Sequence, residues 1–176
     1  ETMRVLDMYK EFVENDLAVP VLAGKKTDRE KFAGALDTYA IEGLMSDGKA
    51  LQMGTSHNLG QHFAKVFNIR YEDRGQNLQF VWQTSWGVST RLIGALVMSH
   101  GDDSGLLFPP RVAPTQVVII PISIGNWRES ILPTAERIAA GLGGQGLRVK
   151  LDAREEFTPG WKLSEYEMKG VPLRLE

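Results

Sequence analysis

Cysteine is absent from this chain of 176 residues, and histidine occurs only three times. Without cysteine, neither disulfides nor thiolate zinc sites can form. The histidines are scattered without metal-ligand spacing, so the sequence predicts no metal site built by the chain itself. The lack of cysteine is compatible with a reducing compartment, and we expect a cytoplasmic protein.

The chain also lacks a strong charge of either sign and a long apolar run. Its 20 Lys and Arg against 22 Asp and Glu leave a formal net charge of -2, so contact with nucleic acid has to come from a local patch. Its apolar runs are far shorter than the roughly 20 residues of a membrane span, and the N-terminus has no signal-peptide layout. Because the chain begins at Glu1 rather than at Met, we expect a piece of a longer protein.

The most informative stretch runs from Ser85 to Asp103. A strand-like apolar run precedes it, and apolar residues then recur at helical spacing, so the pattern predicts a strand that leads into a helix. Gly87 lies at the junction, where a missing Cβ lets a flat ligand approach, and Ser89 or Thr90 can cap the helix. Arg91 falls in the first turn, where its guanidinium and the helix amides can face an anion. These residues alone fit a nucleotide site and an ordinary capped helix equally well.

The first half of the chain predicts a helix followed by an antiparallel sheet. Residues 1–16 carry an apolar stripe at helical spacing, and residues 17–23 resemble a short buried strand. Apolar runs over residues 39–45 and 49–55 are joined around Asp47-Gly48. Asp-Gly at such a joint is a strong hairpin signal because the tight turn needs positive φ.

The second arm of this hairpin carries polar residues on both faces. Strand alternation places Gln52, Gly54 and Ser56 on one face. Thr55 and His57 then fall on the other face, unless the strand twists or ends. Taken alone, His57 fits a hydrogen-bonded structural histidine better than a catalytic one, because no base or metal ligand lies nearby in the sequence.

The second half predicts a different architecture. A proline-rich connection over residues 106–114 precedes the apolar run 116–121, which is typical of a strand buried on both faces. A helical pattern then ends at Gly143-Gly144, and residues 147–151 alternate as a second strand. A strand, a helix and a strand of these lengths predict a parallel βαβ unit.

The amino-acid sequence of these stretches resembles that of one protein family. From Ser85, the run Ser-Trp-Gly-Val-Ser-Thr-Arg, followed by Leu-Ile-Gly-Ala and His-Gly-Asp-Asp-Ser-Gly-Leu, closely resembles the third motif of class II aminoacyl-tRNA synthetases. Its form is that of prolyl-tRNA synthetases of the archaeal and eukaryotic-like type. Lys31-Phe-Ala-Gly-Ala35 and Gly54-Thr-Ser-His-Asn-Leu-Gly-Gln61 resemble the segment between motifs two and three. Glu165-Tyr-Glu-Met-Lys-Gly-Val-Pro-Leu-Arg174 resembles the anticodon-binding domain, so the likeness covers essentially the whole chain.

The resemblance implies an α/β fold of the α+β kind. Residues 1–112 would be the C-terminal part of a class II catalytic domain, with an antiparallel sheet, helices and motif three. Residues 113–176 would be the N-terminal part of a smaller βαβ anticodon-binding domain.

The resemblance also implies site residues. In the proline pocket it places Phe32, His57 and Trp86, whose aromatic rings suit a small apolar substrate. At ATP and the adenylate it places Gln52, Thr55, Ser89 and Arg91, with Arg91 on the phosphates as the catalytic residue. Without the resemblance, aromatic residues such as Phe32 and Trp86 would be assigned to the core.

For the anticodon, the resemblance implies Glu167 and Arg174. Arginine suits guanine because its guanidinium can bond two acceptors of one base. Without the resemblance, Glu165, Glu167 and Lys169 would be assigned to a solvated face. The family usually has Trp at the position of Tyr166 and Ala at that of Gly43. The first change is expected to alter packing beneath Glu167.

The family joins proline to ATP, giving prolyl-adenylate and pyrophosphate, and then passes the prolyl group to tRNA(Pro). The resemblance therefore implies ATP, Mg²⁺, proline and tRNA(Pro) as ligands, a homodimer of the complete enzyme, and no membrane. Motifs one and two are absent, so we expect the isolated chain to be inactive. One alternative is a non-catalytic tRNA-binding module derived from a class II synthetase, and another is a synthetase for threonine or histidine. The retained nucleotide-site residues favour the enzyme, since an RNA-binding module has no need of them.

Overall fold

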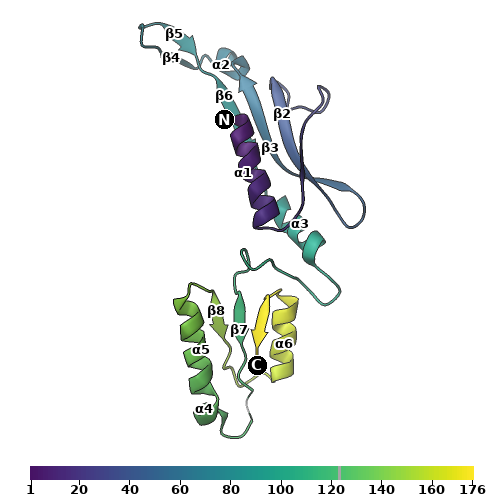
Figure 1. The fold of residues 1–176 in the computed structure, drawn as a ribbon. Helices are drawn as coiled ribbons and strands as arrows, with labels where there is room; N and C mark the ends of the chain where they lie inside the picture. The colour runs from purple at the N-terminus through teal and green to yellow at the C-terminus, as the bar shows by residue number, and fades with distance from the viewer. Residues whose placement is uncertain (123) are drawn as a thin grey trace. The chain divides into compact units, whose positions relative to one another are not determined.

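The computed structural model describes residues 1–122 and 124–176, which form two compact units, residues 1–95 and 96–176 (Figure 1). The fold class is confirmed, because an antiparallel sheet with helices is followed along the chain by a small parallel sheet. Residues 96–112 group with the second unit because the N–H groups of Leu106 and Phe108 donate to Met168 O and Gly170 O. The domain boundary after residue 112 stays a prediction.

The first unit is built on a four-stranded antiparallel sheet of order β1-β2-β3-β6. The β2–β3 hairpin turns at Gly48, whose φ is +79°, which confirms the predicted Asp-Gly turn. The unit also contains the short helix α2 (His62–Val66), a separate β4–β5 hairpin, and the start of α3 (Arg91–His100). The strands are β1 (Leu22–Lys25), β2 (Asp37–Leu44), β3 (Ala50–Gly60), β4 (Arg70–Glu72), β5 (Leu78–Phe80) and β6 (Gln83–Gly87).

Helix α1 (Thr2–Asn15) covers one face of this sheet, as its course beside β3 in Figure 1 shows. Ser56 is fully buried beneath it, and the Ser56 hydroxyl donates to Thr2 O at 2.8 Å. A Cβ on Gly54 would lie 3.3 Å from the Tyr9 ring. The residues that follow α1 differ from the expected strand over 17–23, because Val19 N–H bonds back to Val13 O.

A β-bulge in the β2–β3 ladder corrects the predicted placement of Gln52. Ile41 lies opposite Gly54, but its neighbour Glu42 lies opposite Gln52, so Met53 is one extra residue in β3. Residues directly opposite each other project to the same face of an antiparallel pair. Gln52 therefore lies on the face of Thr55 and His57, not on that of Gly54 and Ser56.

The second unit is a three-stranded parallel sheet of order β8-β7-β9. Along the central strand and the residue that follows it, Val117 and Ile119 pack against Ala135 of α5, while Val118 and Ile120 pack against Tyr166 of α6. Alternate residues of β7 thus meet helices on opposite faces, and the βαβ prediction is confirmed. The elements are β7 (Val117–Ile119), α4 (Trp127–Ser130), α5 (Leu132–Gly144), β8 (Val149–Leu151), α6 (Pro159–Met168) and β9 (Leu173–Leu175).

Candidate functional site

The first candidate site lies on the sheet face opposite to α1. Thr38 pairs with His57 across β2 and β3, while His57 and Thr55 pair with Ser85 and Gly87 of β6. These opposed residues share one face. The sheet therefore presents Thr55 and His57 side by side with residues of the strand that precedes Arg91.

Phe32 is brought against His57 from the segment before β2. The two ring centroids are 5.1 Å apart at 45°, and Phe63 of α2 lies 6.2 Å from Phe32. Phe32 is 49% exposed, so it is a surface wall rather than a core residue. Burial lowers the pKa of the half-buried His57, so the neutral ring is favoured.

Trp86 is not brought to this pair. It lies opposite Ser56 in the β3–β6 ladder, and Ser56 faces α1. A step of one residue along a strand reverses the face, so Trp86 and Ser85 project to opposite sides. The role of Trp86 in the proline pocket stays a prediction, one that this register does not support.

Gln52, Ser89 and Arg91 meet at the start of α3. The Arg91 N–H donates to Ser89 Oγ at 3.3 Å, as expected for a helix cap, and Arg91 Nη1 donates to Gln52 O at 3.1 Å. Within the described part of the chain, no carboxylate is paired with the exposed Arg91. Its guanidinium is therefore placed beside β3 with donors left for an anion.

Two residues that the sequence did not single out belong to this site. Thr38 is 3% exposed and contacts both Phe32 and His57, and Phe63 extends the aromatic surface beyond Phe32. A groove of about 650 Å³ runs instead along β1 and β2, and none of the predicted site residues line it.

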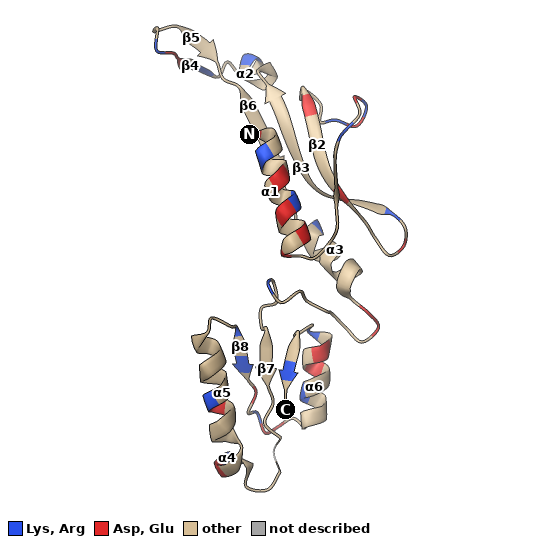
Figure 2. Cartoon of the chain, in the orientation of Figure 1, with Lys and Arg blue, Asp and Glu red and all other residues tan. Residues whose placement is uncertain are grey.

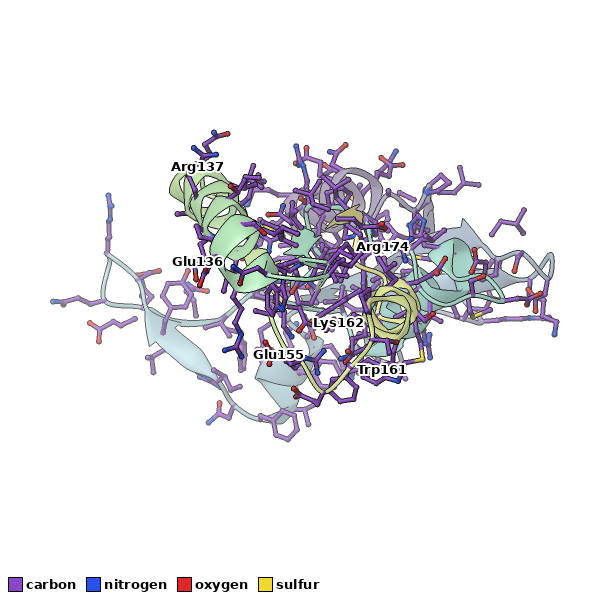
Figure 3. The ribbon with its side chains drawn as sticks, turned by 90° about the horizontal axis from the view of Figure 1, so that it is seen from below. Glu136, Arg137, Glu155, Trp161, Lys162 and Arg174 are labelled. Carbon is purple, nitrogen blue, oxygen red and sulfur yellow. The ribbon has the colours of Figure 1, made fainter. Side chains whose placement is uncertain are left out.

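The second candidate site is formed by α6 and β9. Arg174 Nη1 lies 3.3 Å from Glu167 Oε2 and donates to Leu163 O at 3.1 Å. Figure 3 shows Arg174 close to α6, the helix that carries the labelled Trp161 and Lys162. The structure thus brings together the two residues expected at the anticodon. Both side chains are partly exposed, Glu167 at 49% and Arg174 at 33%.

A largely buried ion cluster ties α6 to the end of β8. Arg154 Nη2 lies 2.7 Å from both Asp152 Oδ2 and Glu165 Oε2. The buried Lys162 donates to Asp152 O at 3.1 Å, and the Tyr166 hydroxyl donates to Asp152 Oδ2 at 2.9 Å. We call these five residues the ion cluster: Asp152, Arg154, Lys162, Glu165 and Tyr166.

The ion cluster shifts the pKa of its acidic groups in opposite directions. The Arg154 hydrogen bond holds the pKa of Asp152 well below its usual range, against the opposing effect of burial. Burial, with the hydrogen bond to Asp152, raises the pKa of Tyr166 to about 12. Tyr166, at a position where the resemblance leads one to expect Trp, therefore serves as a buried donor to the Asp152 carboxylate.

Figure 2 shows both signs of charge along α1 rather than one basic stripe. Among residues 1–122 and 124–176, no group of three His, Asp or Glu side chains could hold a metal ion. No helix in these ranges has the length and apolarity needed to cross a membrane. Local geometry, rather than a global field, has to carry any recognition.

Comparison with known proteins finds similarity both for the second half and for the whole of the chain. Residues 116–176 match the model of the anticodon binding domain family. The whole chain is 61% identical to the proline–tRNA ligase of Natranaerobius thermophilus and 57% identical to that of Symbiobacterium thermophilum. It is 56% identical to the proline–tRNA ligase of Chlorobium chlorochromatii. Over its whole length, the chain matches members of the proline–tRNA ligase family.

The similarity covers all 176 residues of the chain but only 36% of each of these relatives. The chain thus spans about a third of the length of these ligases, and residues 116–176 of that stretch match the anticodon binding domain. The archaeal and eukaryotic-like subtype stays a prediction.

Proposed function

We propose that this chain supplies part of the proline and ATP sites of a proline–tRNA ligase, together with part of its anticodon-binding surface. The complete enzyme would form prolyl-adenylate and pyrophosphate from proline and ATP, and then transfer the prolyl group to tRNA(Pro). The observation that carries this proposal is the convergence of Phe32, His57, Thr55 and Gln52 on one sheet face beside Arg91.

The aromatic pair of Phe32 and His57 suits proline. Their rings form a half-open wall, and a small apolar ring binds such a wall through contact area and shape. His57, held neutral by burial, adds a hydrogen-bonding edge without a positive charge.

Arg91 suits the phosphates of ATP. Attack of a carboxylate on the α-phosphate brings two anions together, so the reaction depends on positive groups that are in place beforehand. The cap at Ser89 and the bond to Gln52 O hold Arg91 at the start of α3, near the helix N–H groups. Thr55 lies opposite Gly87 in the β3–β6 ladder, and the nucleotide part of ATP would pass beside it.

Glu167 and Arg174 suit the anticodon. An ion pair between two partly exposed side chains is weak in water, so a base can replace one of its contacts at little cost. Single-stranded loop bases present the acceptor edges that an Arg can bond.

We expect Mg²⁺ to accompany ATP in the complete enzyme, although the described residues offer no cluster of ligands for it. Homodimer formation and a cytoplasmic location are likewise expected of the complete enzyme. The isolated chain should be inactive, because it lacks the second Arg expected from motif two.

The proposal is tested by proline-dependent ATP–pyrophosphate exchange in the complete ligase, with threonine, histidine and alanine as controls. Arg91→Ala should lower the exchange rate by about 10²- to 10³-fold, as for loss of a preorganised charge partner. Arg74→Ala, at an exposed Arg in the β4–β5 turn, is the matched control and should leave the rate unchanged.

A second arm tests the anticodon surface. Arg174→Ala should raise KM for tRNA(Pro) in aminoacylation while leaving the exchange reaction intact. Retained tRNA binding without exchange for any amino acid would instead favour the non-catalytic module.

A further inference from the structure

Thr38 lies between the two residues of the proposed proline wall. Its Oγ1 accepts a hydrogen bond from Phe32 N–H at 3.0 Å and lies 2.9 Å from His57 Nδ1. It is 3% exposed and stands directly opposite His57 in the β2–β3 ladder. One buried hydroxyl therefore touches the backbone of Phe32 and the ring of His57.

The protons of this arrangement can be assigned from the bonding capacity of a hydroxyl. Threonine Oγ1 has one proton to donate and lone pairs with which to accept. One lone pair is used by Phe32 N–H, and His57 Nδ1 is the only acceptor that the described residues offer to the Thr38 proton. A buried donor without an acceptor is unfavourable, so the Thr38 proton points to Nδ1.

This assignment decides the form of the histidine. A ring nitrogen that accepts a hydrogen bond carries no proton, so a neutral His57 has its proton on Nε2. Burial already disfavours the charged ring, which would carry protons on both nitrogens. The remaining Nε2–H is a donor, which suits a carboxylate oxygen of an amino-acid substrate.

We propose that Thr38 is a positioning residue that holds His57 as the Nε2–H tautomer and anchors Phe32 beside it. The wall is then formed before the substrate arrives, with its ring orientation and its donor already fixed. The link to proline rests on the function proposed above, whereas the tautomer is a property of this chain alone.

The tautomer is measured by long-range ¹H–¹⁵N correlation NMR on the 176-residue chain labelled at histidine. His57 should show a protonated Nε2 and an unprotonated Nδ1. Thr38→Ser, which keeps the hydroxyl, should preserve this pattern. Thr38→Val, which keeps the shape and loses the hydroxyl, should give a mixture of both tautomers, with the exposed His62 unchanged as an internal reference.

A protonated Nδ1 in the unaltered chain would overturn the proposal, and so would an unchanged His57 pattern in Thr38→Val. The first of these outcomes needs no variant, so the test stands even if Thr38→Val does not fold.

The functional consequence is measured in the complete ligase. Thr38→Val should raise KM for proline about tenfold, the size of one lost hydrogen bond, while KM for ATP stays the same and Thr38→Ser stays near the unaltered enzyme. Equal proline KM values for Thr38→Val and Thr38→Ser in an active ligase would refute the positioning role. Absence of proline-dependent exchange in the unaltered ligase would refute the proposed function instead, and would leave the tautomer assignment in place.

Discussion

The two units hold their candidate site residues in opposite ways. In the first, neutral hydrogen bonds and ring contacts hold Phe32 and His57, and Arg91 is left without an acidic partner among the described residues. In the second, Glu167 and Arg174 are paired with each other, and Glu167 lies on α6, which a largely buried cluster of charges ties to the end of β8.

The difference follows from the size and nature of what each site is expected to receive. A small, partly anionic substrate needs donors that are free before binding, and Arg91 and the Nε2–H of His57 meet that need. A tRNA loop is large and binds through many weak contacts, so its surface needs a helix held in a fixed place. The ion cluster supplies that support through the buried Asp152, Lys162 and Tyr166, with Arg154 and Glu165 partly exposed at its edge. Three predictions test this contrast, from the largest expected effect to the smallest.

Asp152→Asn should have the largest effect and should act on the second unit. Removal of one partner from a buried ion group leaves the other charge uncompensated, here Lys162, which costs about 3 to 5 kcal/mol of the free energy of unfolding. Urea denaturation followed by amide NMR signals should show earlier unfolding of residues 96–176, with the signals of residues 1–95 little changed.

The matched control is Glu167→Gln, which removes a partly exposed ion pair from α6, the helix that carries Lys162. Its cost should be about 0.2 to 1 kcal/mol. Equal effects of the two variants would mean that the ion cluster is no more than a surface network.

Acid should weaken the first unit before the second. The lowered pKa of His57 gives a stability contribution that is present above the unfolded value of about 6.5 and is lost as the pH falls through the folded pKa. The pKa of Asp152 is also lowered, so its contribution is present above about 3.9 and is lost only in stronger acid. Hydrogen exchange between pH 7 and pH 4 should therefore show loss of protection in residues 1–95 first.

His57→Gln is the control, because it removes the titrating ring. In this variant, the loss of protection near neutral pH should disappear. Simultaneous loss in both units would contradict the contrast between a neutral site and a charged support.

Local patterns predicted much of the frame. Asp47-Gly48 predicted the β2–β3 turn, Ser89 predicted the cap of α3, and the apolar run before Pro121 predicted the buried strand β7. Each of these features depends on residues that are neighbours in sequence. The resemblance added the residues expected at the sites, and the structure brought Phe32 to His57 and Glu167 to Arg174.

Long-range register was beyond the sequence. No residue type in the sequence predicts the bulge at Met53. Yet this one extra residue moves Gln52 to the sheet face opposite to α1 and sets Thr38 opposite His57. The ion cluster was missed for a related reason. Glu165 fitted a solvated face by pattern, but its side chain is only 13% exposed because α6 packs back onto the end of β8, where Arg154 reaches it.

Gly43→Ala should have the smallest effect on the free energy of unfolding. Gly34→Ala, at a second glycine of the first unit, should have a larger one. A Cβ on Gly43 would lie 2.6 Å from Met53 Cε, the mobile end of a flexible side chain, so repacking should keep the change in unfolding free energy within about 1 kcal/mol. At Gly34 the backbone has φ +89°, and a Cβ would lie 2.8 Å from the Phe63 ring, so Ala should cost about 1 to 3 kcal/mol and disturb the aromatic wall. Urea midpoints of the first unit measure both variants. A Gly43→Ala loss as large as that of Gly34→Ala would show that Met53 is fixed in place, and that the bulge beneath the site is a rigid element rather than an adaptable one.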